Sequence, residues 1–262
     1  MKHLLLSSAA LLVGSLAAIP AMADPVRVTV TVENVVPENG VAFAPLRLGF
    51  NSGVFDAFDL GEVATAPIIS VAEGGTGTDW FPAFAAADPN AVLGSVAPDP
   101  AGPLLPGATA SATFTVDPTV NPYFTFAAMV IPSNDFFIGN DSPTRYRLFD
   151  DNGMQILTEI TQQTNVVWDA GSEIFDPAAA AFVGDNGLRE EQGSVVAFSC
   201  AELNAFSGLT TGAGYVLDSQ LAADETIYRI SFNVTPIPLP GALPLFIGAL
   251  AGAWGLRRRR AG

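Results

Sequence analysis

An alternation of hydrophobic and polar residues marks the start of the main body of the chain. Valines occupy the even positions from 26 to 32, and polar residues occupy the odd positions from 27 to 33. A period of two is typical of a β-strand with one buried face. Similar patterns predict strands at 110–116, 124–131, 194–199 and 225–234. In the last of these, Tyr228, Ile230, Phe232 and Val234 are predicted to share one face.

Frequent turn-forming residues separate these short strands. The chain has 25 glycines and 20 prolines, which suits many turns and lies below the level typical of low-complexity disorder. Short strands with regular breaks predict an all-β fold, an antiparallel β-sandwich formed by one domain over 24–235. Two stretches, 74–107 and 134–164, are predicted to be long loops. Loops of this length are usually functional or need a stabilising group such as a bound metal.

The first 23 residues have the three parts of an export signal. Lys2 is the positive region, 4–19 is apolar, and Ala21-Met22-Ala23 is a cleavage site of the small-x-small type. We therefore expect a signal peptide over 1–23.

The last 27 residues form a second predicted signal, over 236–262. A proline-rich stretch at 236–240 is followed by the uncharged apolar run 241–256 and by four arginines, 257–260. This run is close to the minimum length for crossing a bilayer, and the arginines indicate its cytoplasmic side. We expect transient membrane anchoring through this segment.

The composition excludes several kinds of chemistry. The only lysine is Lys2, the only histidine is His3 and the only cysteine is Cys200. The body therefore cannot use a histidine base, a lysine Schiff base or a Cys/His zinc site. A formal charge of −15 argues against nucleic-acid partners. One cysteine cannot form an internal disulfide, so Cys200 is expected to be buried or, alternatively, to pair between molecules.

Carboxylates remain as the candidate functional groups. Asp135 directly follows the predicted strand 124–131, where a sandwich displays its loops. Asp169 and Glu173 lie four residues apart around Gly171, which permits a sharp turn. Two acidic loops that meet suit calcium, which binds six to eight oxygen atoms. The alternative for these acids is a solvated turn.

The same segments resemble the spondin domain family. Residues 129–139 (MVIPSNDFFIG) and 168–173 (WDAGSE) are similar to its two hallmarks, and 53–61 and 71–74 look like motifs of its bacterial members. The resemblance implies a sandwich similar to membrane-binding calcium sandwiches. It also implies calcium (Ca²⁺) at one end, held by Asp135, Asp169 and Glu173. Ser172 stands where the family usually has threonine, and 174–177 departs from its pattern.

The C-terminal segment resembles bacterial exosortase sorting tails of the PEP-CTERM type, in the variant built on Val-Pro-Leu-Pro-Ala. Here the motif is Ile237-Pro238-Leu239-Pro240-Gly241. The resemblance implies a Gram-negative host, cleavage by an exosortase-type enzyme, and delivery to the cell surface or its matrix.

Three functions agree with these features. The first is a non-catalytic, calcium-binding adhesion or matrix module, with extracellular polysaccharide or surface proteins as partners. The second is a carboxylate enzyme that acts on glycans, for example through Asp169 and Glu173. The third is a purely structural envelope protein whose acids serve solubility. Carboxylates that share calcium stay ionised, and this favours the first function over the second.

Overall fold

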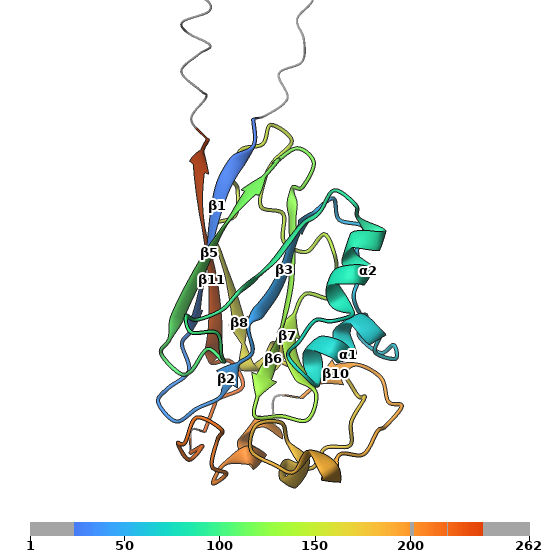
Figure 1. Ribbon diagram of the computed structural model, residues 1–262, viewed down its shortest axis with the longest axis vertical. Helices are drawn as coiled ribbons and strands as arrows, with labels where there is room; N and C mark the ends of the chain where they lie inside the picture. Colours follow the sequence, from blue (N-terminus) through green and yellow to red (C-terminus); the bar gives the residue numbers. More distant parts are fainter. Residues whose placement is uncertain (1–23, 200–201, 219, 238–262) are drawn as a thin grey trace, which may run out of the picture.

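The computed structural model describes residues 24–199, 202–218 and 220–237, and its main feature is a pair of antiparallel sheets (Figure 1). The first sheet has the order β5-β1-β11-β8. The second has the order β10-β9-β7-β6-β3-β4, with the short β2 also paired to β6. The strands of the first sheet are β1 (Val26–Asn34), β5 (Thr109–Val116), β8 (Glu159–Gln163) and β11 (Thr226–Pro236). Those of the second are β2 (Ala42–Phe43), β3 (Leu46–Asn51), β4 (Val92–Val96), β6 (Tyr123–Ile131), β7 (Phe136–Gly139), β9 (Trp168–Asp169) and β10 (Ala197–Phe198).

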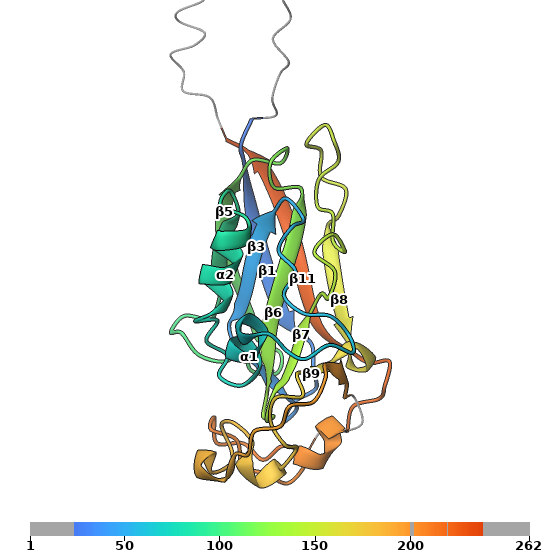
Figure 2. The same cartoon turned by 90° about the vertical axis from the view of Figure 1, so that its right-hand side faces the viewer.

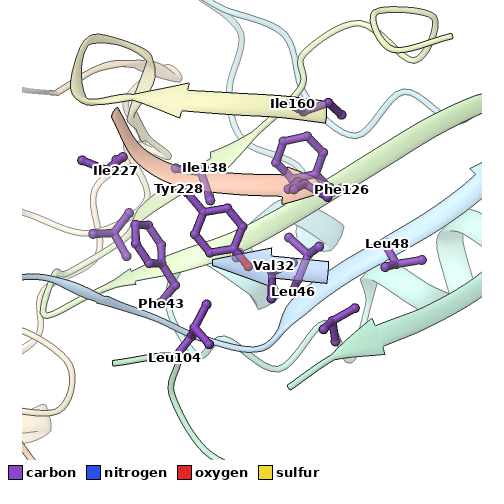
Figure 3. Close-up of a cluster of buried hydrophobic side chains, with 14 of the residues drawn as sticks. Val32, Phe43, Leu46, Leu48, Leu104, Phe126, Ile138, Ile160, Ile227 and Tyr228 are labelled. Carbon is purple, nitrogen blue, oxygen red and sulfur yellow. The ribbon is translucent and has the colours of Figure 1, made fainter. Parts of the chain in front are cut away.

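The hydrophobic core lies between the two sheets (Figure 3). Each strand of the first sheet turns alternate residues inward, so that Val28, Val30 and Val32 are almost completely buried. They meet aromatic residues of the facing sheet and Tyr228 of β11, whose ring contacts Phe43 edge to face at 4.7 Å. The predicted all-β sandwich is therefore confirmed, and so is the alternation predicted in β1, β5 and β11.

Two helices cover the outer face of the second sheet, α1 (Ala66–Ala72) and α2 (Trp80–Ala87) (Figure 1). They contribute to a second hydrophobic cluster that includes Trp80 and Phe84. A Cβ atom at Gly49 of β3 would stand 2.5 Å from the ring of Phe84, so glycine at this position lets α2 approach the sheet. Short 3₁₀ helices occur at Thr164–Val166, Pro177–Ala179, Asn186–Leu188 and Glu202–Phe206.

The predictions of long loops at 74–107 and 134–164 are both wrong in part. The stretch 74–107 contains α2 and β4, and the stretch 134–164 contains β7 and β8. Helix α2 reads Trp-Phe-Pro-Ala-Phe-Ala-Ala-Ala and so lacks the polar face that reveals a surface helix. Strand β7 is buried on both faces and therefore shows no alternation. The predicted strand at 194–199 is reduced to the two residues of β10.

The described ends of the chain lie together, far from the segments that carry the acidic candidates. Val26 pairs with Pro236 in the β1–β11 register, and Figure 1 shows the segments after β9 gathered at the opposite end of the sandwich. No helix among the described residues is long and apolar enough to cross a bilayer. The predicted signal peptide (1–23), Cys200 and nearly all of the predicted sorting tail (238–262) lie outside the described residues.

Candidate metal centre

Asp135 lies in the turn between β6 and β7 and is 1% exposed. Its Oδ2 atom accepts three hydrogen bonds from the next loop. The backbone N–H groups of Ser172 and Glu173 donate at 2.8 and 3.0 Å, and the hydroxyl group of Ser172 donates at 3.1 Å. Asp135 therefore holds in place the loop that carries Glu173.

Asp169 is the last residue of β9. It pairs there with Phe136, the first residue of β7, which directly follows Asp135 in the chain. Its Oδ1 atom accepts a hydrogen bond from the N–H of Gly171 at 2.6 Å, which closes a tight turn. Gly171 has a φ of +65°, and a Cβ atom there would stand 2.7 Å from the carbonyl oxygen of Val195. The turn predicted from the sequence thus needs glycine, for both its dihedral angle and its space.

The carboxyl groups of Asp135 and Asp169 lie near enough for each to affect the pKa of the other. Burial, followed by the negative charge of Asp135, raises the pKa of Asp169 to about 7. Burial also raises the pKa of Asp135, although the hydrogen bonds from residues 172 and 173 oppose this shift. Asp135 is buried and Asp169 is half-buried, and two carboxylates this close repel each other unless a proton or a cation lies between them.

The carboxylate of Glu173 turns to a different partner. Glu173 is 5% exposed, and its Oε1 atom forms an ion pair of 3.0 Å with Nη1 of Arg189. Its Oε2 atom is buried with no hydrogen-bond partner. Burial raises the pKa of Glu173 to about 7, Arg189 opposes this shift, and the negative charges of Glu73 and Asp135 add to it.

The group as a whole carries an excess of negative charge. When ionised, Asp135, Asp169 and Glu173 carry two negative charges more than Arg189 neutralises, and Glu73 and Glu202 add to the negative field. One divalent cation would balance the excess of the three carboxylates. Buried oxygen atoms, one of them unpaired, match the ligands that calcium prefers. Across residues 24–199, 202–218 and 220–237, however, no three Asp, Glu, His or Cys side chains are arranged as a ready metal site. The structure joins Asp135 to Asp169 and leaves the Glu173 carboxylate on Arg189, so the predicted triad stays a prediction.

Aromatic residues beside these loops are part of the core. Phe136 and Phe137 are fully buried and Trp168 is 6% exposed. Trp168 stacks on Phe198 with ring centroids 4.3 Å apart.

Arg189 is a residue of this group that the sequence analysis did not predict. It lies beyond the Trp-Asp-Ala-Gly-Ser-Glu motif in a segment without regular alternation, so no period or spacing relates it to Glu173. One signal was available: it is one of few arginines in a body with a large acidic excess, and a buried acid needs a basic partner.

Stability of the metal-free protein should rise on acidification from pH 8 to pH 5.5. Asp169 and Glu173 have folded-state pKa values of about 7, above their values in the unfolded chain, so the folded state binds protons more tightly. Stability then grows as the pH falls through 7 and is lost as the pH rises. Urea unfolding in EDTA at both pH values measures this increase in the free energy of unfolding. Asp169→Asn should reduce the increase by about 1 kcal/mol, which is less than the free energy of one pKa unit. If the stability of Asp169→Asn depends on pH as strongly as that of the unaltered protein, the raised pKa assigned to Asp169 is wrong.

No family model matches the chain, and no curated protein matches it.

Proposed function

We propose that this protein is an exported, non-catalytic adhesion or matrix module whose loop end is stabilised by calcium. The observation that carries the proposal is the pairing of the buried Asp135 with the half-buried Asp169, two carboxyl groups from separate loops whose ionised forms repel each other and would be stabilised by a cation between them. The resemblance to the spondin domain supports the same ion and the same residues.

Calcium would act here as a crosslink. Asp135 belongs to the β6–β7 turn, and Asp169 belongs to the turn after β9. Without a cation the two carboxylates repel each other. A bound cation would attract both of them and so link the two turns. Glu173 is the natural third ligand, because its backbone N–H already bonds to Asp135 and its Oε2 atom is unpaired. A rotation of its carboxylate would exchange all or part of the Arg189 contact for the metal.

The cellular setting rests on the two predicted processing signals. An export signal over 1–23 and a sorting tail over 236–262 direct the protein to the surface of a Gram-negative bacterium. There the acidic body would remain soluble and would meet extracellular polysaccharide or surface proteins. An exosortase-type enzyme would process the tail.

Calorimetric titration of the full chain with CaCl₂ tests the proposal. We expect one binding site per chain, which Asp169→Asn abolishes or weakens by about a hundredfold, a loss of ~2.7 kcal/mol. Glu190→Gln is the matched control, because it removes an exposed carboxylate from the same loop end and should leave binding unchanged. If calcium does not bind, or binds equally well to Asp169→Asn, the proposal is wrong.

A further inference from the structure

A polar cleft lies beside the candidate metal centre, where the two sheets approach each other at one edge. Its walls come from β8 in the first sheet, and from Trp168 of β9 and the end of β7 in the second. Figure 2 shows these three strands on the same side of the molecule. The cleft has a volume of about 370 Å³, which falls in the range of small-molecule sites.

One buried side chain in this cleft has an unused hydrogen-bonding atom. Gln162 of β8 is 2% exposed, and its Nε2 group donates to the hydroxyl of Tyr146 at 3.1 Å and to the carbonyl of Thr161 at 3.2 Å. Because an amide oxygen would repel the Thr161 carbonyl, this orientation of the amide is the stable one. The Oε1 atom is then buried without a partner, at a cost of about 1–3 kcal/mol. A ligand hydroxyl group that donates to Oε1 would remove that cost.

The remaining walls combine polar groups with an aromatic surface. Asn140, Tyr146 and Arg145 line the cleft from the segment after β7, and Phe198 lines it from β10. Phe198 is 49% exposed although its ring stacks on the buried Trp168. A firmly supported ring beside amide and hydroxyl groups suits a ligand with an apolar face and a rim of hydroxyl groups.

We infer that this cleft binds a neutral saccharide, with the Oε1 atom of Gln162 accepting from a sugar hydroxyl and the ring of Phe198 packing against sugar C–H groups. Arg145 and Asp141 contribute one charge of each sign, so the lining favours no net charge on the ligand. The inference gives the proposed adhesion function a ligand class and a binding site. It does not require calcium, because neither Gln162 nor Phe198 is a candidate metal ligand.

Saturation-transfer NMR with the full chain tests this inference, with cellobiose, maltose and diacetylchitobiose as neutral probes and digalacturonate as the charged comparison. We expect at least one neutral disaccharide to bind with a Kd of about 1 mM, a typical value for a weak single site. Gln162→Leu and Phe198→Ala should each weaken binding about five- to tenfold, the effect of one hydrogen bond or one ring contact.

Phe182→Ala is the matched control, because Phe182 is also 49% exposed and lines a different cavity. Phe198→Ala changes a half-exposed residue and so remains informative if Gln162→Leu does not fold. The inference is overturned if no neutral disaccharide binds, if digalacturonate binds best, or if neither variant weakens binding. Sugar binding by an unaltered protein that does not bind calcium would contradict only the metal part of the proposed function. Calcium binding without sugar binding would contradict only the cleft.

Discussion

Calcium added to the EDTA-treated protein is expected to raise its melting temperature by about 5–10 °C. A ligand that binds only the folded state stabilises it by ~2.7 kcal/mol when its concentration is a hundredfold above Kd. In a domain of this size, each kcal/mol corresponds to a shift of about 2–4 °C. Calcium should bind the unfolded chain poorly, because Asp135 and Asp169 meet only in the fold. Differential scanning calorimetry in EDTA and in CaCl₂ measures the shift.

Asp135→Asn should remove most of this shift, because it removes the more deeply buried of the two paired charges. Glu191→Gln again alters only an exposed carboxylate of the same loop end and should keep the full shift. Identical melting of the unaltered protein in EDTA and in CaCl₂ would contradict a stabilising role for calcium in this sandwich.

Arg189→Met is expected to destabilise the metal-free protein by about 1.4 kcal/mol at pH 8. The buried Glu173 carboxylate loses its counter-charge, and a group with a pKa of about 7 then limits the cost by taking up a proton. Calcium should restore much of this loss, because the cation then becomes the only positive charge beside Glu173. The melting shift caused by calcium should therefore be larger in Arg189→Met than in the unaltered protein. Urea unfolding with and without calcium gives both values.

The double variant Arg189→Met/Glu173→Gln separates charge from packing. It removes both members of the ion pair and should recover most of the stability lost in the metal-free single variant. Its calcium shift should fall below that of the unaltered protein, because a ligand is gone. Equal calcium shifts in the unaltered protein and in Arg189→Met would show that Glu173 does not contribute to the metal centre.

Several strands were predictable because apolar residues at their buried positions alternate with polar residues at their exposed ones. Strands β1, β5 and β11 have inward residues that alternate with exposed or half-exposed ones, and the sequence alternates with them. The missed elements lack a matching sequence pattern. Strand β7 is apolar and buried on both faces, and α2 is apolar throughout although part of it is exposed. Strand β8 alternates in burial, but one of its buried positions is the polar residue Gln162.

The candidate site was predictable where it depends on local geometry. The turn at Gly171 follows from glycine and a neighbouring aspartate that can accept its N–H. The meeting of Asp135 with Asp169 depends on the pairing of β7 with β9, which no local pattern specifies. The contact between Glu173 and Arg189 depends on the course of an irregular segment. The sequence alone therefore could not predict the contact between Glu173 and Arg189.

The position of the chain ends has a mechanical consequence. β11 runs through the middle of its sheet. It pairs with the whole of β1 on one side, through Tyr228 to Pro236, and with β8 on the other. A tether that continues from the end of β11 would transmit tension along this strand while a ligand held the opposite end of the sandwich. Antiparallel backbone hydrogen bonds lie perpendicular to the strands, so such tension strains the whole ladder in shear instead of opening it one bond at a time. If the proposed sorting tail anchors the domain, the β1–β11 ladder would therefore resist tension between that anchor and a bound ligand.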